Sequence, residues 1–261
     1  MKKILVILFC LFFSQIGTAF SLELSWFYVQ HREYANGKSV NRLGFGLTDE
    51  KGQSITDDNI VKSVTLFDPY GNVVNLPPSE FYIDEEIYGY YDGKNSQWNY
   101  RDEWQVVSWF RADFSEPLIP GIYRLIIETQ DGRESELTYK FNKLIRLPIL
   151  SSSSIRLNTD SFGNVVWKWD IPEELGRLAF NHKTTARAAI EVFKNQKNVA
   201  FFSVKVPSHM GYIFIPRDLV QSINKKGDKF GLKIQLEAKD NNYRTYSDVL
   251  MINDLKSIRK E

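Results

Sequence analysis

The clearest indication of the fold is Leu232-Lys233-Ile234-Gln235-Leu236-Glu237-Ala238, in which apolar and polar residues alternate throughout. Successive side chains of a β-strand point to opposite faces, so this period of two predicts a strand with one buried face. The same alternation occurs at residues 43–47, 123–127, 137–141 and 165–171. The chain is therefore predicted to be all-β.

Turn signals separate these runs. Asp131-Gly132 lies between two extended segments, which is the signature of a β-hairpin. Asn36-Gly37 and Asp68-Pro69-Tyr70-Gly71 mark further turns. Leu219, Val220 and Ile223 are spaced like one face of a helix, so a single short helical turn is expected at residues 217–223.

The N-terminus has the features of a signal peptide. Lys2 and Lys3 precede an apolar run at residues 4–13, and Gly17-Thr18-Ala19 offers small residues for cleavage. A retained anchor is the less favoured alternative, since a bilayer-spanning helix needs about 20 apolar residues. Cys10, the one cysteine, lies inside this run, and lipidation there is a further, disfavoured alternative because Phe9 stands where a small residue is expected. We predict a signal peptide at residues 1–19 and no integral membrane segment after its removal.

The rest of the chain divides into two segments of domain size. Residues 20–142 and residues 155–258 each contain a full set of strand patterns. Residues 143–154, with Pro148 and four consecutive serines after an apolar stretch, are predicted to be a linker that packs against one domain or continues a strand. This organisation predicts two tandem β-sandwiches.

Two family resemblances carry the same expectation. Residues 155–254 resemble a fibronectin type III domain, through Val166-Trp167-Lys168-Trp169, the alternating run at 232–238 and Tyr246-Ser247-Asp248-Val249. The first segment resembles a bacterial immunoglobulin-like domain, through Asp68-Pro69-Tyr70-Gly71 and Pro120-Gly121-Ile122-Tyr123. Both resemblances imply an architecture and no particular activity. The tryptophans at 167 and 169 share one strand face and are predicted to be core residues.

Charge and motif content exclude several function classes. Lys+Arg number 33 and Asp+Glu 32, so the chain lacks the basic excess of a nucleic-acid binder. The three histidines, His31, His182 and His209, do not have metal-ligand spacing. The sequence also lacks a G-x-S-x-G elbow, a phosphate-binding glycine loop and an H-E-x-x-H motif. We therefore predict no cofactor, no metal site and no catalytic residues.

Carboxylates invite two other hypotheses. Asp84, Glu85 and Glu86 form an acidic cluster that could hold calcium, but a solvated acidic turn anchored by Ile83 and Ile87 is the favoured interpretation. A glycosidase pair drawn from Asp84, Glu86, Asp102 and Glu103 would need two carboxyls about 5 to 10 Å apart across a cleft.

An aromatic-rich stretch supplies the candidate binding site. Between the rings of residues 88–100 lie Gly, Asp, Asn, Ser, Lys and Gln, a composition that favours a loop over a strand. Long loops in small domains tend to be functional, and aromatic rings offer flat faces to sugars or partner proteins. A core or sheet-edge role for the rings remains the alternative. The hypothesised ligand-binding residues are Tyr88, Tyr90, Tyr91, Trp98, Tyr100 and Trp104.

Together these observations predict an exported, non-catalytic binding or interaction module of the bacterial cell envelope or surface, located in the periplasm or outside the cell. Its expected partner is a protein or a polysaccharide, recognised through the aromatic-rich loop. A carbohydrate-active enzyme, or its accessory carbohydrate-binding part, is the first alternative. A periplasmic assembly chaperone that donates a strand from residues 137–146 is the second.

Overall fold

The computed structural model describes residues 22–142, 144–182, 184–238 and 242–255. Strands dominate these residues, so the predicted all-β class is confirmed. The predicted signal peptide at residues 1–19, with Cys10, lies outside the described residues. The strands, in chain order, are β1 (Glu23–Tyr34), β2 (Ser39–Thr48), β3 (Val61–Phe67), β4 (Glu80–Asp92), β5 (Gln97–Tyr100), β6 (Gln105–Phe114), β7 (Gly121–Thr129), β8 (Glu134–Phe141), β9 (Arg156–Thr159), β10 (Val165–Lys168), β11 (Thr184–Lys194), β12 (Lys197–Pro207), β13 (Tyr212–Ile215), β14 (Lys229–Ala238), β15 (Tyr243–Tyr246) and β16 (Leu250–Ile252).

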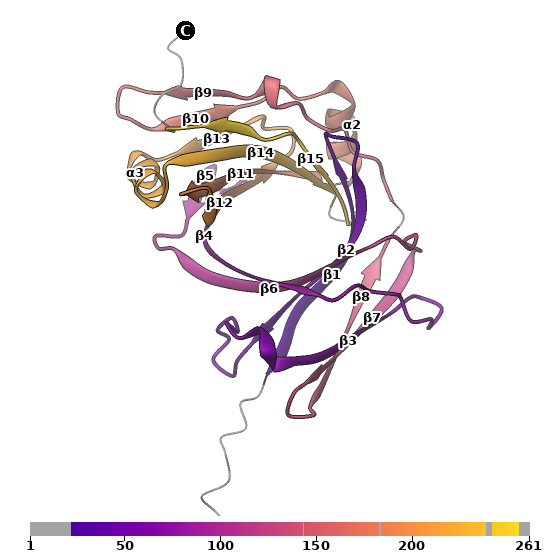
Figure 1. The fold of residues 1–261 in the computed structure, drawn as a ribbon. Coiled ribbons are helices and arrows are strands. Elements are labelled where there is room, and N and C mark those ends of the chain that lie inside the picture. The colour runs from indigo at the N-terminus through magenta and orange to yellow at the C-terminus, as the bar shows by residue number, and fades with distance from the viewer. Residues whose placement is uncertain (1–21, 143, 183, 239–241, 256–261) are drawn as a thin grey trace, which may run out of the picture.

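Eight strands form a closed ring, visible in Figure 1. The order is β11-β12-β4-β6-β2-β1-β15-β14, and β14 pairs with β11 to complete the circle. Strand β5 adds to β4, and β16 adds to β14. The ring contains strands from both halves of the chain.

Two parallel pairings join the halves. Strand β12 pairs with β4, from Phe201↔Glu86 to Lys205↔Tyr90. Strand β1 pairs with β15, from His31↔Tyr243 to Tyr34↔Tyr246. An edge strand leaves N–H and C=O groups unpaired, so joining edge to edge at two seams satisfies these groups in both halves.

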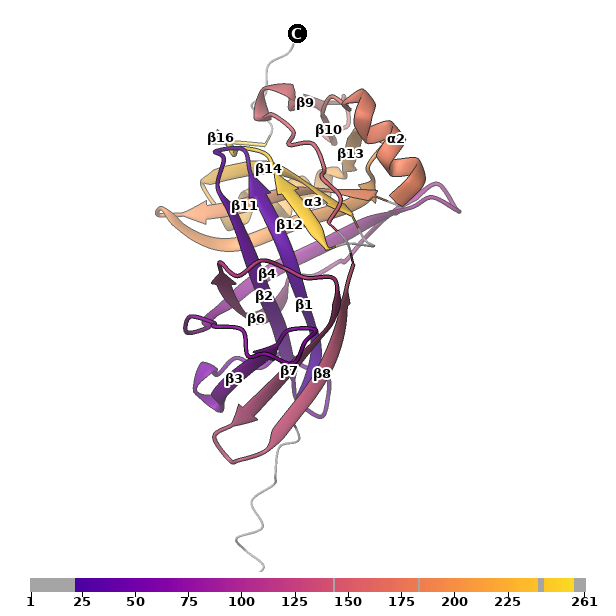
Figure 2. The same cartoon turned by 90° about the vertical axis from the view of Figure 1, so that its right-hand side faces the viewer.

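Two three-stranded sheets cover the outside of the ring at opposite ends (Figure 2). The sheet β3-β7-β8 packs on β1, β2 and β6, and the sheet β13-β10-β9 packs on β11, β12 and β14. Each interface is a separate apolar core. The first includes Phe45, Phe110 and Tyr123, and the second includes Trp167 and Phe202. Trp167 and Trp169 are both in the second core, as predicted.

Two helices lie in the second half. Helix α3 (Arg217–Lys226) confirms the expected helical turn and buries Val220 and Ile223. Helix α2 (Glu173–His182) was not expected. Its signals are Glu173 and Glu174 in the first turn, which favour a helix N-terminus, and Leu175, which is fully buried.

The predicted linker contains a short 3-10 turn, η2 (Ser152–Ser154); a similar turn, η1 (Asp58–Ile60), precedes β3. Leu147 and Leu150 enter the second core, so the linker packs against one half as its apolar residues suggested. The prediction of two tandem sandwiches did not include the ring, in which hydrogen bonds unite strands from both sides of residues 143–154. Alternation reports which face of a strand is buried, but not which strand lies beside it.

Candidate functional site

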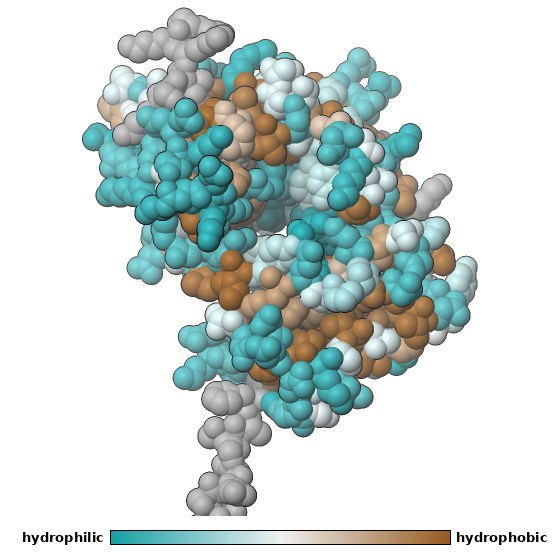
Figure 3. Space-filling model, in the orientation of Figure 1, coloured by the Kyte–Doolittle hydropathy of each residue, from teal (hydrophilic) through white to brown (hydrophobic). Residues whose placement is uncertain are grey.

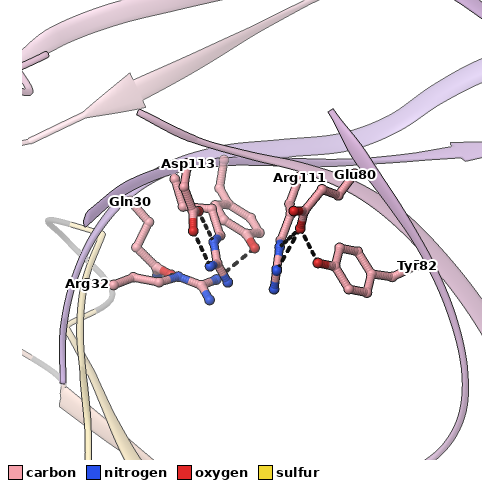
Figure 4. A network of polar contacts seen from close by, with 8 residues as sticks. Gln30, Arg32, Glu80, Tyr82, Arg111 and Asp113 are labelled. Atoms are coloured by element: carbon pink, nitrogen blue, oxygen red, sulfur yellow. Dashed lines mark hydrogen bonds and ion pairs between the residues drawn. The ribbon is translucent and has the colours of Figure 1, made fainter. Parts of the chain in front are cut away.

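Alternation along the ring strands sends one set of side chains to the cores and the other set into the ring. On β1, Phe27 and Val29 belong to the first core, so the residues between them face inward. Figure 4 shows side chains from β1, β4 and β6 pointing into this space. We use the name inner wall for the following inward-facing residues of β1, β2, β4 and β6: Trp26, Tyr28, Gln30, Arg32, Arg42, Gly44, Gly46, Glu80, Tyr82, Trp109, Arg111 and Asp113.

Trp26 and Tyr28 form a flat aromatic platform on this wall. Their ring centroids are 5.8 Å apart and their planes differ by 6°. Each ring lies over a glycine of β2: a Cβ on Gly44 would fall 2.4 Å from Cζ of Tyr28, and one on Gly46 would fall 2.5 Å from Nε1 of Trp26. The glycines therefore let both rings lie against the strand. Trp26 remains 41% exposed.

A second pair of rings continues the wall across β6 and β4. Tyr82 and Trp109 stack with centroids 5.7 Å apart and planes 13° apart. Arg111 lies 4.2 Å from the centre of the Tyr82 ring and donates two hydrogen bonds to Oε2 of Glu80, at 3.0 and 2.7 Å. We call Trp26, Tyr28, Tyr82 and Trp109 the wall rings.

Charged groups next to the rings are held by ion pairs. Arg42 donates to both carboxylate oxygens of Asp113, at 2.5 and 2.7 Å. Burial disfavours the charge of each partner, but the pairing outweighs it, so the pKa of Arg42 is raised and the pKa of Asp113 is lowered. Arg111 and Arg32 lower the pKa of Asp113 further, which places all three arginines near one carboxylate.

The opposite side of the ring has its own ion-pair network around Glu237. Arg244 and Lys205 approach this carboxylate at 2.9 and 3.7 Å. Burial alone would raise the pKa of Glu237, but the charges of Arg244, Lys205 and Arg187 lower it to about 2. Three cations thus lie around this one carboxylate, and the Nε atoms of Arg187 and Arg244 are buried without a hydrogen-bond partner among the described residues.

The acidic cluster is part of strand β4 and not a turn. Alternation turns Asp84 and Glu86 inward and Glu85 outward, where Lys226 donates to it. Burial, with the nearby charges of Glu86 and Glu191, raises the pKa of Asp84 to about 6. The inward position of Asp84 and Glu86 could not be predicted from the sequence, because a run of three acids resembles a solvated turn. Their environment is determined by the pairing of β4 with β6 and β12.

The six residues of the predicted aromatic site fall into two groups. Tyr88 and Tyr90 face the inside of the ring, where their rings lie 6.4 Å apart and Arg187 lies over Tyr88. The other four, which we call the hairpin rings, pack against the second core: Tyr91, Trp98, Tyr100 and Trp104.

The hairpin rings make hydrogen bonds to other elements of the fold and thereby stabilise it. The hydroxyl of Tyr100 donates to the carbonyl of Phe214, and Nε1 of Trp104 donates to Oγ of Ser222 at 3.0 Å. The segment is also not the loop that was predicted, because β4 extends to Asp92 and pairs with β5 around a turn at residues 93–96. Aromatic residues favour strands and cross-strand pairs, and this preference outweighed the polar residues between them.

The sequence pattern did not identify Trp26 and Tyr28 as a site. The available signal was the Gly44-Phe45-Gly46 pattern, two glycines at alternate positions of a strand. Interior strand glycines mark a close approach, in this structure by rings of the neighbouring strand.

Two further features concern other kinds of site. Within the described residues, no group of three or more His, Cys, Asp or Glu side chains is arranged to hold a metal ion. Nor do these residues include a helix long and apolar enough to cross a membrane. A cavity of about 470 Å³ lies on the outer side of the ring, between β3 and residues 76–81, and its lining mixes apolar residues such as Leu76 and Phe81 with polar ones such as Lys62.

Comparisons with known proteins give little further guidance. No protein-family model matches the chain, and no curated protein matches it significantly. Among solved structures, the chain is similar to the Yersinia pseudotuberculosis adhesin InvE, with 10% identity and a TM-score of 0.23. The match covers 90% of this chain and 61% of the adhesin chain, so the chain spans about three fifths of that structure's length.

Proposed function

We propose that this protein is an exported, non-catalytic binding module of the bacterial cell envelope or surface, which holds a segment of polysaccharide against its inner wall. The observation that carries the proposal is the Trp26–Tyr28 platform, in which two nearly parallel rings lie on glycines and one of them is 41% exposed. An exposed aromatic ring that lies on a glycine is stronger evidence of a binding surface than a ring that covers a core.

The chemistry around the platform supports a sugar ligand. A pyranose has an apolar face of C–H groups that packs on aromatic rings, and hydroxyls at its rim that need donors and acceptors. The inner wall supplies both kinds of group, with Gln30, Glu80 and Arg111 beside the wall rings. Figure 3 shows a recess between the two halves, bordered by hydrophilic residues, at the opening seen in Figure 1.

This proposal revises the location of the predicted site but keeps part of it. Tyr88 and Tyr90 remain candidate contacts, because they face the ring and Tyr90 is 47% exposed. We assign Tyr91, Trp98, Tyr100 and Trp104 to the support of the hairpin. We also propose that an immunoglobulin-like and a fibronectin type III-like sandwich underlie the two halves, since each half has its own core between two sheets.

Tryptophan fluorescence of the chain without residues 1–19 tests the function. We expect titration with a panel of bacterial and plant polysaccharides to shift the emission for at least one polymer, and Trp26→Ala to remove the binding. Phe162→Ala is the matched control, because Phe162 is 76% exposed on the turn after β9 and should leave binding unchanged. The proposal is wrong if no polysaccharide binds, or if Trp26→Ala binds as well as the unsubstituted chain.

One observation favours a second function, a carbohydrate-active enzyme. Asp84 faces the ring with its pKa raised to about 6, within the range used by general acids in glycoside hydrolysis. Assay of reducing ends after incubation with each bound polymer separates the two functions. Turnover that is lost in Asp84→Asn would establish the enzyme, and binding without turnover supports the module.

A further inference from the structure

The inner wall carries three arginines from three different strands: Arg32 on β1, Arg42 on β2 and Arg111 on β6. Figure 4 shows Arg32 and Arg111 extending into the ring, with Asp113 near them. Only two carboxylates of the inner wall take part in their ion pairs, Asp113 with Arg42 and Glu80 with Arg111. The cluster therefore has one positive charge more than its carboxylates balance.

Arg32 is the arginine with the unbalanced charge. Its Nε donates to Oε1 of Gln30 at 2.9 Å, and its Nη2 donates to the hydroxyl of Tyr28 at 2.8 Å. Its guanidinium carbon lies 5.4 Å from the centre of the Tyr246 ring and 5.7 Å from that of Tyr28. In the part of the chain that the structure describes, Arg32 forms no ion pair with a carboxylate, although the residue is only 6% exposed.

The nearby carboxylate of Asp113 is already bonded to Arg42, so no carboxylate among the described residues is bonded to Arg32 itself. A buried charge without a bonded counter-charge is unfavourable unless an opposite charge joins it. The charge of Arg32 also acts on the hydroxyl of Tyr246. Burial would raise the pKa of its hydroxyl, but the charges of Arg32 and Arg244 outweigh burial and lower it. The region next to the platform is thus electropositive in a chain whose net charge is +1.

We propose that the polysaccharide bound on the inner wall is anionic, and that Arg32, aided by Arg111, receives its carboxylate or sulfate groups. This inference rests on the proposed function. A guanidinium presents a planar fork of donors that matches both kinds of oxyanion. Tyr28 lies opposite Gly44, which in turn lies opposite Arg111, so the platform and the arginines share adjacent rows of one wall. The guanidinium of Arg32 lies 5.7 Å from the centre of the Tyr28 ring, so the acid group of a sugar stacked on the platform can reach this arginine.

Calorimetric titration with three probes tests the inference: a polygalacturonate oligomer, a neutral galactan oligomer of equal length, and dextran sulfate. We expect the anionic probes to bind at least about tenfold more tightly than the galactan, and raising NaCl to about 0.3 M to weaken them selectively. The relative affinities for polygalacturonate and dextran sulfate distinguish the carboxylate from the sulfate.

Arg32→Gln should lower the affinity for the anionic probes about tenfold and leave the galactan unaffected. Its melting temperature should stay equal or rise, because the variant removes a buried charge without a bonded counter-charge. If Arg32 had a purely structural role, Arg32→Gln would lower the melting temperature. Arg32→Lys keeps the charge but loses the planar fork of donors, so its affinity for the anionic probes should be intermediate. This variant tests the inference even if Arg32→Gln does not fold. Arg124→Gln, on β7 with its side chain 43% exposed, is the control that should leave the affinity for the anionic probes unchanged.

The two proposals fail in distinguishable ways. Equal binding of anionic and neutral probes, with Trp26→Ala losing both, would overturn the anionic ligand and leave the polysaccharide module standing. Binding of none of the probes by the unsubstituted chain would overturn this inference. The broad polysaccharide panel then decides whether the binding function fails with it.

Discussion

The wall rings and the hairpin rings contain the same residue types but have opposite roles in this molecule. Tyr91, Trp98, Tyr100 and Trp104 are concentrated in a short stretch and pack against the second core. Trp26, Tyr28, Tyr82 and Trp109 come from three separate strands and meet on the inner wall. The density of rings along a sequence therefore does not identify a binding surface. What matters is the face of the sheet on which the rings lie.

Tyr100→Ala should have the largest effect on stability. The substitution removes a ring that lies 6.3 Å from Phe202 and a hydroxyl that donates to the carbonyl of Phe214. We expect the free energy of unfolding to fall by about 3 kcal/mol. Urea denaturation measures this loss, and Tyr90→Ala, which removes an exposed ring on the inner face, should cost much less. Equal losses would mean that the hairpin rings do not differ from inward-facing ones.

Gly44→Ala tests whether the platform depends on its glycine. The new Cβ would fall 2.4 Å from Cζ of Tyr28, so the ring must move off the strand. We expect a loss of about 2 kcal/mol in stability and weaker binding of any ligand that stacks on Tyr28. Gly93→Ala is the matched control, since a Cβ there meets nothing within 4 Å. Unchanged stability and binding in Gly44→Ala would remove the geometric basis of the platform.

Asp84→Asn should change the pH dependence of stability. The folded chain raises the pKa of Asp84 from 3.8 to about 6, so the folded state binds more protons than the unfolded state between these values. Stability contributed at this position therefore falls as pH rises from about 4 to about 6. After allowance for solvent screening, the variant should be about 1 kcal/mol more stable than the parent at neutral pH. At about pH 3.5 the two should be equal. Denaturation at both pH values measures the difference, and a pH-independent offset would contradict the assignment.

Trp26→Ala should have the smallest effect on stability, because the ring is partly exposed and lies on the wall. We expect a change of no more than about 0.5 to 1 kcal/mol in chemical denaturation. This small change would accompany the loss of polysaccharide binding, the reverse of what Tyr100→Ala should show. A large loss of stability would instead place Trp26 with the core residues.

Local pattern predicted much of this fold and little of the site. Alternation located the strand at Leu232–Ala238 and the core position of Trp167, because a strand with one buried face has apolar residues at every second position. The ring depends on the parallel pairings of β12 with β4 and β1 with β15, which join residues far apart in sequence. No local signal specifies those partners. For the same reason, Arg32, Arg42 and Arg111 could not be grouped before the sheet order was known.

Ligand binding on the inner wall can be followed through the indole N–H signals of the chain's six tryptophans in a ¹⁵N-tryptophan-labelled sample. Single Trp→Phe substitutions assign the signals, and an anionic oligosaccharide is then titrated into the protein. Binding on the inner wall predicts that the signals of Trp26 and Trp109 shift while those of Trp98 and Trp104 stay in place. Shifts confined to Trp98 and Trp104 would contradict it and return the binding surface to the hairpin.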